Sequence, residues 1–460
     1  MSAETLSTPP LKAKPRRNRW RLLLKLFLAF LVVFIPWACW FFHDGPLPDD
    51  ADLKYTYKPI PEDQNAWSRL AQLGLRANQF HDLAPVEVEM DISRNLTLVE
   101  RYLEVQKEVF DQAKEILRDR LLPAPDPVSE MTYVNDAPLD FVAEYLVLRG
   151  QDSLIHQQWE PLLSDVSLLM ELADKTSASD LPASQQIAMR GLFLFAKLLN
   201  DPKTPHSVLT TALGIIPESG KAFSPLPEVL NYEYAKFRTA VIDRGVSPHG
   251  FFNNPAVFAT SEGWRFLLTY IEILPHRTAS LMAGDLRAAE KLLALPYSQL
   301  AKHFSLIDSR ELRFRQEKMR NGWLVLFQRN GGGVALEQSR FLGVLENVQT
   351  AYQIEAVTQV VRAALAARLY WDDTGNLPVT LANLAPKYLP VLPLDPFDGK
   401  PLRYSLQKRA VYSVSINFWD DLFPSTYEDV FRWRYGMSNI LQPMLELSFA
   451  PPGPPDSSKK

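Results

Sequence analysis

The chain has 460 residues and a formal net charge of −4 at pH 7. Its first 42 residues hold seven of the 49 basic and one of the 53 acidic residues, so the remainder has a net charge of −10. Because phosphate binding needs a basic face, this balance argues against nucleic acid as a partner. The only cysteine is Cys39, so no disulfide is expected, which favours a bacterial cell envelope over a eukaryotic secreted protein.

Residues 21–42 predict a transmembrane anchor. Between Leu22 and Phe42 the only charge is Lys25, and a helix of this length spans roughly 30 Å, the thickness of a bilayer's hydrocarbon core. Segment 1–20 is basic and acids follow the span, so the positive-inside rule predicts a cytoplasmic N-terminus and a bulk in the periplasm or outside. A cleaved signal peptide is the alternative, but the apolar run is longer than such peptides have and ends in bulky residues where cleavage needs small ones.

The segment 43–62 is rich in proline and predicts a linker that lifts the rest of the chain off the membrane. Residues 63–333 predict a helical domain, an irregular stack of antiparallel helices without a fixed repeat period. The expected helices, bounded mostly by Pro, Gly or Asn, cover residues 65–80, 95–121, 138–149, 153–176, 183–200, 226–244, 262–274, 277–295 and 297–320.

The part from residue 334 to 440 has a different character. A long helix is expected from Val334 to Trp371, and an acidic turn that ends in Gly375 stops it. The further expected elements are a short helix at 379–384, a hairpin of strands 402–405 and 410–416, and a disordered tail at 441–460. The expected fold class is therefore mainly α: one N-terminal transmembrane helix, an irregular multi-helix exterior domain, and a small C-terminal α+β module.

Residues 364–406 resemble the globular headpiece of the type II secretion major pseudopilins. The shared scheme is a helix that ends in tyrosine, an acidic turn with a glycine, a short helix, and two aspartate-containing turns. It is carried here by Tyr370, Gly375, Pro378, Leu384, Tyr388-Leu389-Pro390, Asp395-Pro396-Phe397, Asp398-Gly399 and Pro401-Leu402-Arg403-Tyr404. The stretch is still more similar to a group of membrane-anchored envelope proteins, common in planctomycetes and verrucomicrobia, that carry this module after a long helical region. Leu274-Pro275-His276-Arg277-Thr278 is similar to a motif of that region.

The resemblance implies a small α+β headpiece and a role beside secretion or pilus machinery. Pseudopilin headpieces commonly bind calcium in a C-terminal acidic loop, and the matching place here holds Asn417, Phe418, Trp419, Asp420 and Asp421. We interpret these residues as a solvated turn, because two adjacent carboxylates beside two aromatic rings make a poor version of that loop. The anchor lacks the glycine cleavage site and following glutamate of pilins, so pilus assembly through this helix is not expected.

The sequence predicts no catalytic residue, cofactor or metal site, since it contains no HExxH, CxxC or GxSxG motif. The nearest approach to a phosphate loop, Gly214–Lys221, has five residues between its glycines and Ala222 after its lysine, and it predicts a helix end and a turn. Residues 329–333 predict a flexible glycine loop, with a ligand-cradling nest as the alternative. No two of the seven histidines have the spacing of a metal-binding pair.

Glu233, His249 and His276 have roles that the sequence leaves open. Glu233 lies between Leu230 and Phe237 on an apolar helix stripe, which predicts a structural ion pair with another helix, with catalysis as the alternative. His249 and His276 predict capping or packing, with membership of a site as the alternative. Turn and cap roles are predicted for Asp372, Asp373, Asp395 and Asp398.

The leading functional hypothesis is a non-enzymatic cell-envelope binding or scaffold protein that uses exposed helical surface, with the lipid bilayer and other envelope or secretion proteins as partners. One alternative is an accessory component of a secretion or pilus system that docks through the C-terminal module. The other is an envelope enzyme whose site is assembled from residues far apart in the sequence.

Overall fold

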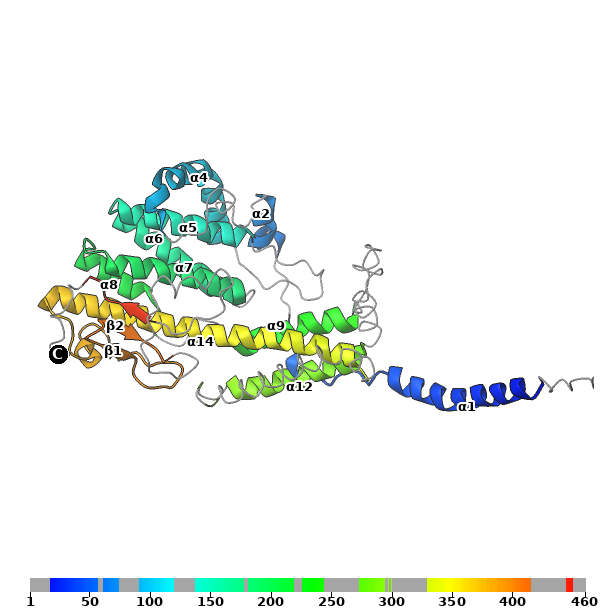
Figure 1. The fold of residues 1–460 in the computed structure, drawn as a ribbon. Coiled ribbons are helices and arrows are strands. Elements are labelled where there is room, and N and C mark those ends of the chain that lie inside the picture. Colours follow the sequence, from blue (N-terminus) through cyan, green and yellow to red (C-terminus); the bar gives the residue numbers. More distant parts are fainter. Residues whose placement is uncertain are drawn as a thin grey trace, which may run out of the picture.

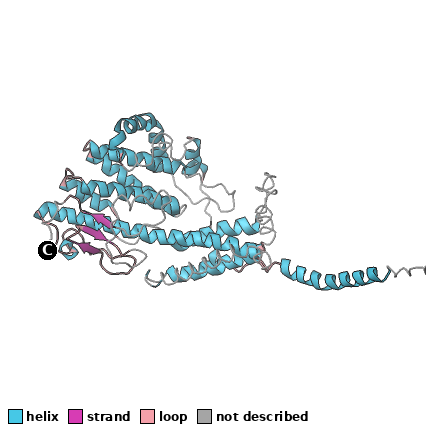
Figure 2. Cartoon of the chain, in the orientation of Figure 1, coloured by secondary structure: helices cyan, strands magenta, loops and turns pink. Residues whose placement is uncertain are grey.

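The computed structural model describes residues 17–56, 61–73, 91–119, 137–177, 181–218, 226–243, 273–293, 297, 299, 329–414 and 444–449. In this part of the chain the fold is mainly helical, with one three-stranded antiparallel sheet (Figures 1 and 2). The α-helices are α1 (Arg17–Phe42), α2 (Ala66–Gln72), α4 (Leu96–Asp119), α5 (Ala137–Ile155), α6 (Trp159–Ser177), α7 (Leu181–Asn200), α8 (His206–Ile215), α9 (Leu226–Arg238), α12 (Pro275–Leu293) and α14 (Gly331–Thr374).

Short helical turns and strands complete the fold. The 3-10 turns are η1 (Ala51–Leu53), η2 (Glu62–Gln64), η3 (Ile92–Asn95) and η7 (Leu381–Leu384), and α9 runs on into a π-helical turn, η4 (Thr239–Asp243). The strands are β1 (Arg403–Ser405), β2 (Ala410–Tyr412) and β3 (Met444–Glu446).

Helix α1 is long and apolar enough to cross a membrane. Its apolar part runs from Trp20 to Phe42, and the most apolar window within it is not buried by the rest of the protein. Figure 1 shows α1 projecting from one end of the remaining chain, which we call the body. Phe41, at the last turn of α1, is the point where the helix meets the body, because its side chain is only 4% exposed.

Helix α14 runs through the body as its longest element. At 1.5 Å per residue its 44 residues extend roughly 66 Å. Its first half lies beside α9 and α12, whereas its second half lies against α7, α8 and the sheet (Figure 1). It ends at Gly375, whose φ of 68° is the left-handed conformation that glycine adopts most readily, and whose N–H donates to the Trp371 carbonyl. The expected stop of this helix is therefore confirmed.

The buried side chains form one large core and two smaller ones. The large core combines α4–α8 with the second half of α14 and with the segment 375–414 plus 444–449, which we call the C-terminal module. A smaller core joins Leu53 to α9, α12 and the first half of α14. Because the large core includes residues on both sides of the expected boundary at 333/334, the C-terminal module and the helical region share one hydrophobic core.

The expected break between helices 138–149 and 153–176 was wrong. Helix α5 continues to Ile155, and the turn follows it at Gln157, which has a positive φ of 57°. A Cβ on Gly150 would lie 2.7 Å from a Leu194 methyl group, so this glycine allows α5 and α7 to approach closely. Helix α8 was not among the expected helices, although a helix end was expected at Gly214.

The expected hairpin is confirmed, and the sheet has one strand more. Strands β1 and β2 pair in antiparallel register, with Tyr404 opposite Val411, and β3 adds on the other side of β2, with Leu445 opposite Val411. The segment 441–460, expected as a disordered tail, thus supplies an edge strand whose Leu445 is buried in the large core. The expected short helix at 379–384 is the 3-10 turn η7, which Thr380 and Asn383 cap reciprocally.

Candidate functional site

The junction between α1 and the body is a polar site that joins distant parts of the described chain. It is formed by residues 43–53, which we call the strap, together with α9, α12 and the start of α14. The strap lies along these helices, so the expectation of a linker that lifts the body away is wrong for this segment. The carboxylates of Asp44, Asp50 and Asp52 bond residues more than 180 positions away in the sequence, and the Leu53 side chain is buried among α9, α12 and α14.

Asp44 caps the N-terminus of α12 from outside the helix. Its carboxylate accepts hydrogen bonds from the backbone N–H groups of His276 (2.9 Å) and Arg277 (3.1 Å). Pro275 occupies the first helical position and Leu274 precedes it, so the helix has no capping side chain of its own. A carboxylate at this end satisfies orphan donors and opposes the helix dipole. The His276 ring also lies 2.8 Å, through Nδ1, from the Gly45 carbonyl oxygen, so the predicted capping or packing role of His276 is confirmed.

The start of α14 closes the same junction from the other side. Asn330 has a left-handed backbone, and its buried side chain accepts from the Leu274 N–H (2.7 Å) and the Thr278 hydroxyl (3.0 Å). A Cβ on Gly333 would lie 2.0 Å from Thr278 Oγ1, so glycine is required there. The predicted flexible loop at 329–333 is therefore wrong, because Gly331–Gly333 form the first turn of α14 and pack against α12.

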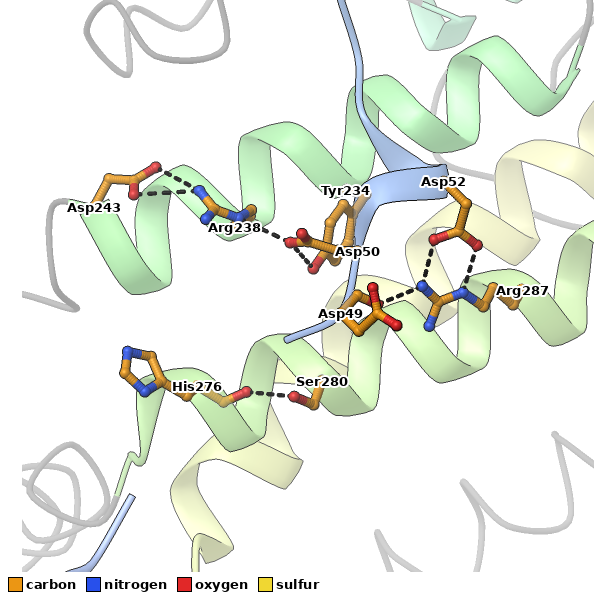
Figure 3. Close-up of polar contacts among 9 residues, drawn as sticks. All are labelled: Asp49, Asp50, Asp52, Tyr234, Arg238, Asp243, His276, Ser280 and Arg287. Carbon is orange, nitrogen blue, oxygen red and sulfur yellow. Dashed lines mark hydrogen bonds and ion pairs between the residues drawn. The ribbon is translucent and has the colours of Figure 1, made fainter. Parts of the chain in front are cut away.

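The middle of the strap contacts α9 (Figure 3). Asp50 accepts from the Tyr234 hydroxyl (2.7 Å) and from Arg238 Nε (2.9 Å), and Arg238 also pairs with Asp243. Burial, together with the hydrogen bond to Asp50, raises the pKa of Tyr234, so the phenol remains a proton donor. This contact fixes the strap to α9, although Asp50 and Tyr234 are 184 residues apart in the sequence.

The end of the strap contacts α12. Arg287 bonds both carboxylate oxygens of Asp52 and also donates to the Asp49 carbonyl (Figure 3). The hydrogen bond from Arg287 lowers the pKa of Asp52 to about 2. The Asp52–Arg287 ion pair is exposed to solvent and so adds little to the stability of the protein, but it fixes the orientation of the strap. Leu53, which follows, is buried in the core that α9, α12 and α14 form.

The side chain of Arg329, just before the start of α14, connects the body to α1. Arg329 donates to the His43 carbonyl (2.8 Å), and its guanidinium lies 4.6 Å from the centroid of the Trp40 ring. Cation–π contact of this kind favours arginine over lysine. The end of α1, the strap and the start of α14 therefore meet at one place.

A buried carboxyl group lies one turn further along α14. Glu337 is 2% exposed, and its Oε1 has no hydrogen-bond partner. Burial, together with the neighbouring Asp285 of α12, raises the pKa of Glu337 to about 8. The Glu337 carboxyl group is therefore protonated at neutral pH and donates a hydrogen bond to Asp285. Sequence reasoning missed this pair, although Glu337 on the inner face of a helix was a readable signal.

The residues whose role the sequence left open have separate positions. Glu233 pairs with Lys236 on its own helix (2.9 Å), so the expected partner from another helix was wrong. Its side chain is partly exposed because α9 turns Tyr234 inward instead. His249 lies outside the described residues, as do Asn417–Asp421 of the expected solvated turn and Lys221 of the glycine-containing stretch. Gly214 of that stretch lies in the last turn of α8, as a helix end predicts.

The turn roles predicted for Asp395 and Asp398 are confirmed, whereas the prediction was wrong for Asp372 and Asp373, which lie in the last turn of α14 and form ion pairs. Asp395 is fully buried and accepts from the N–H groups of Phe397 and Val414, and burial raises its pKa. Although burial opposes it, the hydrogen bond from Arg403 lowers the pKa of Asp398. Asp372 pairs with Arg368 within α14, and Asp373 bonds Lys387 and Tyr388 across the following turn.

One group within the described chain offers ligand atoms for a metal. Glu100, Asp152 and His156 bring one ligand atom each within 4.8 Å of one another at the surface. His156 already lies 3.2 Å from the Asp152 carboxylate, and three ligands are fewer than a closed zinc site uses. Contacts among these side chains therefore account for this group.

Helix caps, ion pairs and the Glu337–Asp285 carboxyl pair hold the end of α1, the strap and the start of α14 together at this junction. No family model, curated protein or solved structure matches this chain. The likeness to pseudopilin headpieces therefore stays a prediction from the sequence.

Proposed function

We propose that this protein is a single-pass, membrane-anchored cell-envelope scaffold that binds other envelope proteins and has no catalytic role. In this proposal α1 is the anchor, its N-terminal side is cytoplasmic, and the body lies in the periplasm or outside. The observation that carries the proposal is the path of α14. It begins beside Arg329, which touches Trp40 of α1, and it ends roughly 66 Å away at the C-terminal module.

The strap supports a spacer function because it removes freedom between the anchor and the body. A flexible linker would let the body tumble, whereas here successive strap carboxylates bond α12, α9 and α12 again. The anchor, α14 and the C-terminal module would then keep a defined spacing. A scaffold that presents a module at a set distance from the membrane needs this arrangement.

The C-terminal module offers apolar side chains to a partner. Val379 (72% exposed) and Val391 (76%) flank the turn η7, and Leu394 and Leu406 are about half exposed. Desolvated apolar side chains at the centre of a contact supply much of the affinity of protein interfaces. Scattered exposed apolar residues are ordinary on a surface, so these residues define where to test rather than a complete interface.

A second candidate function is an accessory role in a secretion or pilus system. It is supported by the order of elements in the C-terminal module: the end of α14, a glycine stop, the turn η7, the Asp395 turn and a hairpin. This order agrees with the scheme that the pseudopilin resemblance implies. Docking through the module would unite this candidate with the scaffold role.

The test is crosslinking and affinity purification of the full-length protein from its native membrane. Deletion of 337–460 is unsuitable, since it removes most of α14 from the large core. The informative variant is Val379→Ser with Val391→Ser, and the matched control is Val105→Ser, an exposed residue (66%) on α4. We expect a partner that the module variant loses and the control retains. Identical partners in both variants would contradict docking through the module, and secretion components among the lost partners would favour the second candidate.

A further inference from the structure

Six of the eight aromatic side chains of α1 follow a regular spacing, and Trp40 and Phe42 lie outside it. Steps of three and four residues connect Trp20, Leu23, Phe27, Phe30, Phe34, Trp37 and Phe41, and all but Leu23 are aromatic. We call these positions the aromatic seam. Alternating steps of three and four give a period of 3.5 residues, which is the a/d repeat of helices that wrap around a partner helix in a left-handed supercoil.

The structure shows the rings of the seam on one face of the helix. Phe30 and Phe34 stack with centroids 5.0 Å apart, Phe34 and Trp37 lie 5.6 Å apart, and Trp37 and Phe41 stack at 5.0 Å. These contacts form a continuous ladder along the outer half of α1. The polar side chains of the span avoid it, because Lys25 and Cys39 both occupy the heptad position opposite the seam.

We propose that the aromatic seam is the surface through which two copies of this chain pair as a parallel, in-register dimer in the bilayer. The inference rests on the membrane anchoring proposed above and adds the partner of the anchor. Lipid chains impose no 3.5-residue period on a helix that faces them, whereas a partner helix does. The periodicity therefore identifies another helix as the occupant.

A second copy is the occupant that the structure favours. Within the described residues α1 is the one helix long and apolar enough to cross a membrane, so this part of the chain supplies no second span to cover the seam. In a two-fold dimer each ring layer meets its own copy, and identical helices match in length and phase without further adjustment. Phe41, the last seam position, is only 4% exposed, whereas Trp37 is 42% exposed, so the surface that is free to pair runs from Trp20 to Trp37.

Ring packing would supply the affinity that small residues supply in other membrane helices. The span has no pair of small residues four positions apart for close backbone approach. Aromatic pairs add favourable contact beyond their buried area, and several layers act together. A dimer of this kind would also place two C-terminal modules on one assembly and so double the number of docking sites.

The test is cysteine crosslinking of the full-length protein in native membranes. Phe30→Cys, Phe34→Cys and Trp37→Cys are made in a Cys39→Ser background, with Val32→Cys as the matched position on the opposite face. The wild-type chain, whose Cys39 lies on that same opposite face, is a second control. After mild oxidation we expect a dimer of twice the chain mass, several-fold more abundant from the seam positions than from Val32 or Cys39. Equal yields at all positions, or a product with a different mass, would overturn the dimer.

Carbonate extraction of the same membranes separates this inference from the anchoring proposal. Release of the wild-type chain into the soluble fraction would overturn both, whereas retention without the seam pattern would overturn the dimer alone. A second variant combines Phe27→Leu, Phe30→Leu and Phe34→Leu, which keeps the span apolar. Energy transfer between labelled copies in lipid vesicles should show roughly tenfold weaker pairing, since three ring layers are lost. Leu22→Ile with Leu28→Ile and Val32→Leu, on the outer face, should leave pairing unchanged.

Discussion

Replacing Glu337 by glutamine should stabilise the protein at neutral pH. Glu337 has a pKa near 8 in the folded state because it is buried beside Asp285, against an ordinary value of 4.5. Between these two values the folded protein holds a proton that the unfolded chain has released. The stabilising contribution of Glu337 to the folded state is therefore fully present below about pH 4.5 and is lost as the pH rises toward 8.

The size of the effect follows from the pKa difference. The free energy of unfolding falls by about 1.4 kcal/mol for each pH unit above 4.5 until the folded-state pKa is reached. At pH 7 the wild-type protein has therefore lost about 3 kcal/mol of stability through this group. Glutamine has nearly the same shape, has no proton to lose, and can donate to Asp285 through its amide. We expect Glu337→Gln to match the wild type near pH 4.5 and to exceed it by about 3 kcal/mol at pH 7.

The assay is denaturant unfolding of the full-length protein in detergent at pH 5, 6, 7 and 8. Glu290→Gln is the matched control, because Glu290 is an exposed acid of α12 and its replacement should leave the pH slope of stability unchanged. A Glu337→Gln variant with the same pH slope as the wild type would show that Glu337 is ionised in the folded state. The inferred proton sharing with Asp285 would then be incorrect.

Three further substitutions test the joints of the fold. Asp44→Ala should lower the unfolding free energy by about 1 kcal/mol through loss of the α12 cap, and equal stability of variant and wild type in a thermal melt would contradict the cap. Gly333→Ala should destabilise the protein by about 2 kcal/mol or more because its Cβ would collide with Thr278. The control Gly343→Ala, on the same helix, has open space around its Cβ and should stabilise the protein by up to about 1 kcal/mol. Similar melting temperatures for the two variants would refute the close contact at Gly333. Asp395→Ala should cost about 2–4 kcal/mol in denaturant unfolding, since two buried N–H groups lose their acceptor, and a loss below about 0.5 kcal/mol would show that water reaches them.

Short-range signals in the sequence predicted several elements well. The run of apolar residues from Leu22 onward predicts α1, because a hydrophobic span is a property of composition and length alone. The stop of α14 at Gly375 follows from the left-handed conformation that glycine tolerates. The hairpin of β1 and β2 is likewise a local structure with a short turn.

Other features depended on partners far away in the chain, so no local pattern could reveal them. Gly150 reads as a helix breaker, but its role comes from a Leu194 methyl group on another helix. Strand β3 has only three residues and exists because β2 offers it a free edge. Glu233 and Glu337 both lie on partly apolar helices, yet packing turned the first toward solvent and buried the second.

Periodicity, composition and turn chemistry act over a few residues, so the amino-acid sequence was enough to predict one long apolar N-terminal helix, a mainly helical body and a small hairpin module. The folded structure was needed to show that residues 43–53 form a strap and that the glycine run starts a helix. The reason is physical: Asp44 acquires its role from N–H groups at the start of α12, 232 residues away, and Gly333 from the side chain of Thr278. Such contacts form when distant segments share one core, so they become visible only once the chain is folded.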